Sequence, residues 1–270
     1  MKTVVLQSHN PDRLNSWQGE CCASVRDWAA KQGFAYRFEG DELFERVPDC
    51  LRRRFAAQPV VLSDLARLLW LRELLENGYE RALWCDADLL VFGELPLSAG
   101  GDRFGRECWV QRDRAGKREG ERIRRYRKIH NAWMQFSDAS PVLGFYIDRA
   151  AALLARAEPP LVAQFIGPKL LTAWHNIAPF DVEERVGMLS PLCMRELLGG
   201  SRGAPSRKNE GALHMLRAGH AQPLQALNLS ASCEGREVDG VLHGPEDYRR
   251  LANGLRSGEL ARRLNGQNPR

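Results

Sequence analysis

The sequence predicts an α/β protein in which a mixed sheet is flanked by helices, with one main domain and a C-terminal extension. The N-terminal part reads strand, helix, strand: an apolar run at Thr3–Gln7, helical spacing of apolar residues over Ser16–Lys31, and a short strand at Phe34–Phe38. A second unit, within Val60–Glu94, has a leucine-rich helix, a Gly turn and an apolar strand. Helices that alternate with short apolar strands are typical of a sheet covered by helices.

Composition places the chain among ordinary globular proteins. Apolar residues make up 44% and charged residues 27% of the 270 residues, and 39 Lys and Arg against 34 Asp and Glu leave a net charge of +5. This mild excess suits a phosphate-bearing ligand or an anionic membrane surface, and it is too small to indicate nucleic acid. The N-terminal apolar run is too short for a secretory signal, no stretch approaches the roughly 18–20 apolar residues of a membrane span, and the seven cysteines lack metal-site spacing. We therefore expect a cytoplasmic protein with reduced thiols.

The helix–strand unit has clear boundaries in the sequence. Ser63 is a natural N-cap, and Asn77-Gly78 ends the helix before the strand Arg81–Cys85. A helix of about 14 residues spans about 21 Å, and the strand with its approach spans about 26 Å. Because a tight turn joins them, the two run antiparallel at nearly matched length. The start of the helix therefore lies beside the end of the strand. The buried stripe of the helix is formed by Leu65, Leu68, Leu69 and Leu75.

This arrangement brings four charged residues to one edge of the sheet. Asp64 and Arg67 lie one turn apart at the helix start, and Asp86 and Asp88 follow the strand. Ligands of open α/β sheets bind at this edge. Two carboxylates at the end of a buried strand are costly unless a cation lies between them. Mg²⁺ or Mn²⁺ typically binds one or two carboxylates together with phosphates and water. The pattern favours a metal-bound nucleoside diphosphate, with Arg67 as a fixed cation and Asp64 as an acceptor for sugar hydroxyls.

The middle of the chain is less regular. We expect a mobile, partly helical excursion over Arg103–Lys128, which is highly charged and interrupted by Gly. A strand is expected at Pro141–Ile147 and a helix at Arg149–Ala157. Leu161–Trp174 is expected to be helical apart from its Gly-Pro pair.

The C-terminal part begins with a change in composition. After Gly199 the chain is rich in Gly, Ser and Arg, which favours a flexible loop, and His243–Leu264 is typical of a terminal helix. We expect a nucleotide-sugar-binding catalytic core over residues 1–198, and a loop with a helical extension over 199–270 that closes the site.

Three of these features together resemble a known family. Ser63-Asp64-X-X-Arg67, the leucine-rich helix ending at Gly78-Tyr79, and Asp86-Ala87-Asp88 before Leu-Leu-Val are similar to the sugar-binding region of Asp-X-Asp (DXD) glycosyltransferases with the GT-A fold, which is Rossmann-type. This group includes the mannosyl- and galactosyltransferases related to clostridial glucosylating toxins, and the glycogenin-like enzymes. The resemblance extends over roughly residues 1–190 and is specific across 60–95. The turn departs from it, since Asn77 stands where Gly is frequent.

The resemblance implies roles for individual residues. Asp64 and Arg67 would contact the donor sugar, and Asp86 and Asp88 would bind Mn²⁺ or Mg²⁺ and the UDP moiety. The motif that supplies a third metal ligand in the family is not clear here, and no residue stands out as a catalytic base or nucleophile. Weaker correspondences are Gln7, Ser8 and His9 at the end of the first strand for the nucleotide, Gly167-Pro168 for a short family segment, and His243 for the third ligand, with Asn228 and Ser230 behind it.

The function implied is a metal-dependent glycosyltransferase of the hexosyltransferase type. It would move a sugar from a nucleoside-diphosphate sugar, a UDP-sugar by resemblance, to an acceptor hydroxyl with retention of configuration. The acceptor could be a glycan, a lipid-linked glycan or a protein, as in surface glycan synthesis. The basic segment 112–128 could contact the inner face of a membrane. Its run Arg122–Lys128 is more often a solvated face than a binding site.

Two other interpretations stay open. A haloacid-dehalogenase-like phosphatase also has two Asp one residue apart after a strand, but there the pair follows the first strand and precedes a Gly-Thr-type turn, whereas Leu-Leu-Val follows Asp88 here. A GT-A-like domain without turnover would serve as a sugar-nucleotide-binding or partner-binding module. Asp64 and Arg67 also have a structural explanation, as a favourable charge at a helix start and its ion-pair partner.

Overall fold

The computed structural model describes residues 1–97, 101–113, 122–199 and 211–267. Its helices are α1 (Ser16–Lys31), α2 (Asp49–Arg54), α3 (Pro59–Glu76), α4 (Pro141–Arg156), α5 (Pro168–Ile177), α6 (Pro191–Leu197), α7 (Ala212–Arg217), α8 (Pro245–Arg256) and α9 (Glu259–Leu264). Its strands are β1 (Thr3–Ser8), β2 (Ala35–Glu39), β3 (Arg81–Cys85), β4 (Leu89–Val91), β5 (Arg103–Arg112), β6 (Ile123–Ser137), β7 (Asp181–Glu183), β8 (Val186–Met188), β9 (Ala226–Asn228), β10 (Glu237–Val238) and β11 (Val241–Leu242).

The central sheet is mixed, as predicted. Its order is β2-β1-β3-β6-β5-β7. β1 pairs in parallel with β2 and β3, β3 pairs antiparallel with β6, and β5 and β6 form a long antiparallel ribbon to which β7 adds in parallel. Because β1 and β3 are parallel, their carboxyl ends meet at the same edge of the sheet.

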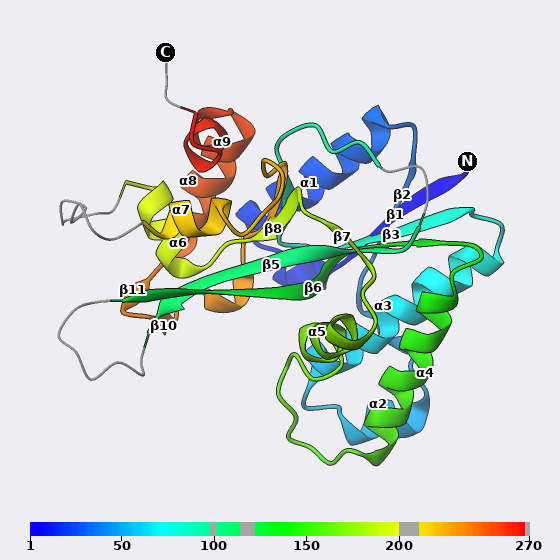
Figure 1. Cartoon of the computed structure of the whole chain (residues 1–270). Coiled ribbons are helices and arrows are strands. Elements are labelled where there is room, and N and C mark those ends of the chain that lie inside the picture. The colour runs from blue at the N-terminus through cyan, green and yellow to red at the C-terminus, as the bar shows by residue number, and fades with distance from the viewer. Residues whose placement is uncertain (98–100, 114–121, 200–210, 268–270) are drawn as a thin grey trace.

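Helices cover both faces of this sheet (Figure 1). One face carries α1 and the C-terminal helices, and the other carries α2 to α5. β1 shows the alternation that this layering requires, since Val4 and Leu6 belong to the α3 side of the core and Val5 to the α1 side. The predicted α/β class, with helices flanking the sheet, is therefore confirmed.

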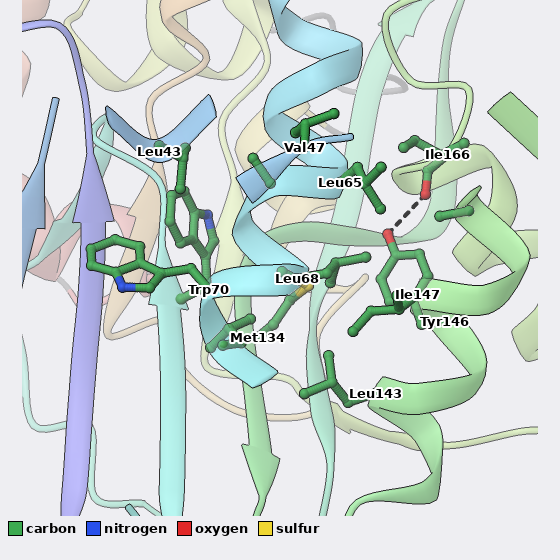
Figure 2. Packing of buried hydrophobic residues seen from close by; sticks show 14 of the residues in the cluster. Leu43, Val47, Leu65, Leu68, Trp70, Met134, Leu143, Tyr146, Ile147 and Ile166 are labelled. Carbon is green, nitrogen blue, oxygen red and sulfur yellow. Dashed lines mark hydrogen bonds between the residues drawn. The ribbon is translucent and has the colours of Figure 1, made fainter. Parts of the chain in front are cut away.

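The helix α3 is held by packing on two sides. Its Leu65 and Leu68 belong to a buried cluster with Met134 of β6 and Tyr146 of α4 (Figure 2). Burial of each such side chain contributes about 1.5–3 kcal/mol. The hydroxyl of Tyr146 donates to the carbonyl of Ile166 at 2.8 Å, which anchors the segment that leads into α5. The core thus places α3 and the start of α5 side by side.

The bounds of several elements match the prediction and others do not. α1 and β3 have the predicted ends. α3 begins at Pro59, earlier than predicted, because Pro is well suited to the first helical position. Ser63 is therefore not the N-cap. It lies inside the helix, where its hydroxyl donates to the carbonyl of Val60 at 2.9 Å.

The predicted strand at Pro141–Ile147 is wrong, since these residues begin the helix α4. Ser140 caps this helix by accepting from the N–H of Leu143, and Pro141 occupies the first turn. The apolar run was compatible with either structure over so short a length. The prediction for Leu161–Trp174 is partly wrong, because the helix begins only at Pro168.

The predicted excursion over Arg103–Lys128 is also wrong in its described part. These residues form β5 and the first half of β6, whose pairing joins Glu107 to Lys128 and Trp109 to Tyr126. The charged residues suggested a loop, but they lie on a ribbon with exposed positions on β6 and half-buried positions on β5. The segment 114–121 lies outside the described residues.

The C-terminal part contributes to a second, three-stranded sheet. β9 lies between β4 and β8 in this sheet, and Leu89 of β4 pairs with Asn228. Strands from both sides of residue 199 therefore share hydrogen bonds, and the division at residue 198 stays a prediction. The predicted terminal helix is two helices, α8 and α9, and the predicted loop at 200–210 lies outside the described residues. Within the described ranges, no helix is both long and apolar enough to cross a bilayer.

Candidate active site

Asp86 and Asp88 follow β3 in a tight turn between two sheets. The N–H of Asp86 donates to the carbonyl of Ala132 on β6 at 2.8 Å, and the N–H of Leu89 donates back to the carbonyl of Asp86 at 3.0 Å. The carbonyl of Asp88 accepts from the N–H of Leu229 at 2.9 Å. The backbone therefore leaves the central sheet at Asp86 and joins the three-stranded sheet directly after Asp88, which fixes both carboxylates at the edge.

Arg67 links α3 to this edge. Its Nη1 lies 2.8 Å from Asp86 Oδ1, and its Nη2 lies 3.2 Å from Asp64 Oδ1. The guanidinium carbon lies 4.8 Å from the ring centroid of Trp84, whose Nε1 also donates to Asp86 Oδ1 at 2.7 Å. The Arg67 side chain is only 8% exposed, so its position is determined by these partners and not by solvent.

Asp64 is buried beside Arg67, with 5% of its side chain exposed. Its Oδ1 accepts from Asn131 Nδ2 at 2.8 Å. Burial raises the pKa of Asp64 to about 6, while the charge of Arg67 and the Asn131 hydrogen bond act in the opposite direction. The backbone of Gly167 passes so close that a Cβ there would lie 2.6 Å from Asp64 Oδ2. The Gly-Pro pair noted in the sequence thus packs directly against this carboxylate.

Asp88 is held by the C-terminal part of the chain. Its Oδ1 accepts from Asn228 Nδ2 at 2.6 Å, and its Oδ2 accepts from the N–H of Ala231 at 2.8 Å. Burial raises the pKa of Asp88 to about 6, the charge of Asp86 adds to the increase, and the two hydrogen bonds oppose it. Asn228, which the sequence placed behind a possible third metal ligand, instead orients Asp88.

These side chains line one cleft of about 700 Å³. Its walls come from α3 and the start of α5, from the turn after β3, from the β5–β6 ribbon and from the segment after β9. The lining residues are Val60, Asp64, Arg67, Asp86, Asp88, Glu107, Trp109, Gln111, Lys128, Asn131, Ala163, Gln164, Pro168, Met188, Asn228, Ser230, Ser232 and Arg236.

The acidic end of the cleft suits a cation that arrives with its own ligands. Arg67 forms ion pairs with the carboxylates of Asp64 and Asp86, and Asp88 lines the same cleft without an ion-pair partner among the described residues. Within the described ranges, no group of three or more His, Cys, Asp or Glu side chains is placed to hold a metal ion. Asp86 Oδ2 has no hydrogen-bond partner among the described residues, and its side chain is 26% exposed. Asp86 and Asp88 therefore fit Mg²⁺ or Mn²⁺ that is also bound by phosphates and water.

The structure brings Ser230 to the lining of this cleft, but not Gln7, Ser8, His9 or His243. Gln7 is buried under Asp86, where its amide donates to the Asp86 carbonyl at 3.0 Å and accepts from the Tyr36 hydroxyl at 2.9 Å. His243 lies with Nε2 3.1 Å from the Pro191 carbonyl and Nδ1 3.5 Å from Asp247. Ser8 donates to the Gly40 carbonyl, and His9 contacts the Asn10 carbonyl and Gln18.

The structure adds residues that the sequence did not single out. Trp84 and Asn131 orient Asp86 and Asp64, and Glu107, Trp109 and Lys128 form the wall opposite them. Trp84 could have been found, because it stands two residues before Asp86 on the predicted strand. The other residues lie on β5 and β6. This segment was predicted to be irregular, so the alternation of side chains along its strands was not recognised.

The basic run on β6 is largely paired within the protein. Arg124 lies 2.7 Å from Asp113, Arg127 lies 3.2 Å from Glu184, and Lys128 lies 3.5 Å from Glu107. Arg125 donates to the Met215 carbonyl at 3.3 Å. This pattern is typical of a solvated, ion-paired face, and it leaves the predicted membrane contact of segment 112–128 without added support.

Comparison with known proteins gives partial structural matches. No protein-family model and no curated protein matches the sequence. A glycosyltransferase involved in the glycosylation of the major capsid of PBCV-1 is 13% identical over 68% of this chain and 82% of its own, with a TM-score of 0.38. Mouse xyloside xylosyltransferase 1 is 10% identical over 86% and 98%, with a TM-score of 0.39. The glycosyltransferase GlyE of Streptococcus pneumoniae TIGR4 is 12% identical over 98% and 63%, with a TM-score of 0.42.

These three structures are of glycosyltransferases. With identities of 10–13% and TM-scores below 0.5, the similarity does not show which reaction, donor, metal or acceptor belongs to this chain.

Proposed function

We propose that this protein is a metal-dependent glycosyltransferase that moves a sugar from a nucleoside-diphosphate sugar, most simply a UDP-sugar, to an acceptor hydroxyl. The observation that carries the proposal is the meeting of Asp64, Arg67, Asp86 and Asp88 in one cleft at the carboxyl edge of parallel strands. A purely structural ion pair would need only Arg67 and one carboxylate. Arg67 is already shared by Asp64 and Asp86, so the further carboxylate of Asp88 in the same cleft favours a bound cation.

The acidic end of the cleft would bind the donor. Asp86 and Asp88 would hold Mg²⁺ or Mn²⁺, which supplies electrostatic stabilisation of the charge that develops on the departing diphosphate. Arg67 adds a fixed positive charge within hydrogen-bond distance of Asp86. Asp64 would accept hydrogen bonds from sugar hydroxyls, in a position set by Asn131 and by the backbone of Gly167.

The C-terminal part would complete the site. Asn228 and the N–H of Ala231 hold Asp88, so residues after 199 support a predicted metal ligand. This supports the proposed organisation into a core over 1–198 and an extension over 199–270 that closes the site. His243 stays a proposal as a third ligand, although its ring nitrogens face Pro191 and Asp247. Retention of configuration is likewise extended to this chain by resemblance only.

The test is donor binding and turnover with matched variants. Thermal-shift measurements with a panel of nucleotide sugars, each with and without Mn²⁺, report affinity as ligand-linked stabilisation. We expect metal-dependent stabilisation by one donor in the wild type, and its loss in Asp86→Asn and Asp88→Asn. Asp113→Asn is a control, because Asp113 forms an ion pair on the ribbon outside the cleft lining. Unchanged donor affinity in both cleft variants would contradict the proposal.

Product analysis separates the alternative functions. A transferase releases nucleoside diphosphate slowly from the donor without an acceptor, and rapidly with one. A binding module gives metal-dependent affinity without release. A haloacid-dehalogenase-like phosphatase would instead release phosphate from simple monoesters, which requires a free aspartate nucleophile. Phosphate release that is lost in Asp86→Asn would support the phosphatase and contradict the transferase.

A further inference from the structure

One face of the β5–β6 ribbon forms part of the wall of the cleft. Glu107, Trp109 and Gln111 alternate along β5, and all three line the cleft. Their partners across the ribbon are Lys128, Tyr126 and Arg124. Residues that pair across antiparallel strands lie on the same face. The face therefore presents an acid–base pair, an aromatic pair and an amide–guanidinium pair in succession, and runs outward from the cleft.

Side chains on the other face of the ribbon pack against the rest of the protein. Cys108 and Val110 belong to the buried cluster beneath the C-terminal helices. Arg106 on this face forms an ion pair with Glu184 at 2.9 Å. The two faces therefore differ in burial: Cys108 and Val110 are fully buried, whereas Trp109 and Gln111 are partly exposed on the cleft face. Glu107 on that face is buried beside Lys128, with which it forms an ion pair.

Trp109 is unusual among the tryptophans of the chain. Five of the seven are buried, while Trp109 and Trp174 are partly exposed. Trp174 contacts the rings of Phe145, Tyr146 and Phe180. Trp109 contacts no ring among the described residues, and the cleft that it lines also contains the polar side chains of Glu107, Gln111 and Lys128. An indole that is open to a polar cleft offers a flat apolar surface for a ligand that is polar at its edges.

We propose that this face is the acceptor site and that the acceptor is a carbohydrate, with a sugar ring stacked on Trp109 and its hydroxyls bonded by Glu107, Gln111 and Lys128. Sugar rings have an apolar C–H face and a polar rim, which is the complement of this arrangement. Glu107 accepts hydrogen bonds, Lys128 donates them, and Gln111 does both. Tyr126, 39% exposed beside Trp109, extends the aromatic surface to a second ring.

A lipid or protein acceptor fits this face less well. The part of the acceptor that binds here would lie between the ribbon and the acidic end of the cleft. The proposed donor site is at that acidic end. Of the exposed apolar residues, Phe145, Leu153 and Ile177 lie on α4 and α5, outside the cleft lining. Val60 is exposed at the cleft and belongs to α3, not to the ribbon. The assignment of this face as the acceptor site rests on the proposed function. Carbohydrate binding by the ribbon can be measured without a donor.

The first experiment is an array of immobilised α- and β-linked mono- to hexasaccharides of glucose, galactose, mannose, xylose and N-acetylglucosamine. The labelled full chain is applied alone and again with UDP and Mn²⁺. The best saccharide is then titrated by calorimetry into the wild type and variants. We expect Trp109→Ala to weaken its binding about tenfold, because an aromatic contact contributes about that much beyond its buried area. Trp109→Phe, which keeps a ring, should recover most of the affinity.

Two further variants keep the result interpretable. Trp174→Phe changes the other partly exposed indole, and saccharide binding should be unchanged. Gln111→Ala removes a polar partner without touching an aromatic residue, so it tests the same face if Trp109→Ala fails to fold by far-UV circular dichroism. We expect Gln111→Ala to weaken saccharide binding at least threefold.

The outcomes separate this inference from the proposed function. Saccharide binding that needs Trp109, in a protein that binds no donor, supports the carbohydrate face and contradicts the transferase. Metal-dependent donor binding without any saccharide on the array, with or without UDP, overturns the carbohydrate face and leaves the donor site standing. Equal saccharide affinity of wild type and Trp109→Ala, or Trp109-dependent sedimentation with phosphatidylglycerol vesicles in place of saccharide binding, also overturns it.

Discussion

Substitution of Gly167 by Ala tests whether the Gly-Pro segment positions Asp64. A Cβ at residue 167 would lie 2.6 Å from Asp64 Oδ2 and 2.9 Å from Asn131 Nδ2, both closer than such contacts occur in folded proteins. Asp64 cannot move away freely, because its Oδ1 is bound to Arg67 and Asn131 at 3.2 and 2.8 Å. The extra methyl group must therefore shift either the carboxylate or the start of α5.

The expected effect combines stability and donor binding. Overpacking a well-filled site costs about 1–3 kcal/mol. We expect the free energy of unfolding of Gly167→Ala to fall by this amount, measured by urea denaturation with far-UV circular dichroism. Affinity for the nucleotide sugar should fall further than affinity for UDP, since Asp64 is proposed to contact the sugar.

Gly144→Ala is the matched control. Gly144 lies within α4, and a Cβ there would meet no atom within 4 Å. Replacement of Gly by Ala inside a helix stabilises by about 0.5–1 kcal/mol. The two Gly→Ala changes should thus shift stability in opposite directions. Equal free energies of unfolding for Gly167→Ala and Gly144→Ala would refute the role given to this segment. Equal losses of UDP and UDP-sugar affinity in Gly167→Ala would also refute it.

Three further predictions follow from buried polar groups. Arg67→Met should lower the free energy of unfolding by about 3–5 kcal/mol, because it leaves buried carboxylates without their counter-charge. The double variant with Asp64→Asn should recover part of this loss, and strictly additive values in urea denaturation would contradict the coupling. Burial lowers the pKa of His130 to about 3 and that of His220 to about 4. Both pKa values lie below the ordinary 6.5, so on acidification the unfolded chain binds protons that the folded chain does not. Each histidine therefore lowers the free energy of unfolding by up to about 1.4 kcal/mol per pH unit as the pH falls from about 6.5 toward 4. His130→Gln should reduce that slope in unfolding measured between pH 6.5 and 4.5, and an unchanged slope would show that this histidine is already protonated in the folded state. Tyr146→Phe should lower the free energy of unfolding by about 1–2 kcal/mol because a buried carbonyl loses its donor; a thermal-denaturation curve identical to that of the wild type would argue against this contribution.

Secondary structure was predictable where a strong local signal agreed with its surroundings. α1 and β3 have an unambiguous period and clear ends, and their predicted bounds hold. Pro141–Ile147 shows the opposite case, because its short apolar run fits a strand or a helix, and Ser140 with Pro141 decides for a helix. The β5–β6 ribbon was missed because its charges pair across strands, and such pairing cannot be read from one strand alone.

Some residues of the candidate site were predictable from the sequence and others were not. Asp64, Arg67, Asp86 and Asp88 were found because their spacing along one helix and one strand implies a shared edge. Asn131, Asn228 and Gly167 orient two of those carboxylates, yet they lie 67 to 140 positions away from them along the chain. Nothing in their local sequence relates them to an aspartate.

From its residues alone, this chain could be recognised as an α/β protein with a pair of carboxylates facing a helix-borne arginine, because helix and strand geometry is local and a tight turn leaves few arrangements. The opposite wall of the cleft, the burial that raises the pKa of Asp64 and Asp88, and the support of Asp88 by residues of β9 depended on long-range packing. Packing joins segments whose separation along the chain carries no periodic signal, and burial is a property of everything that surrounds a group. Both therefore emerge only when the whole chain is folded.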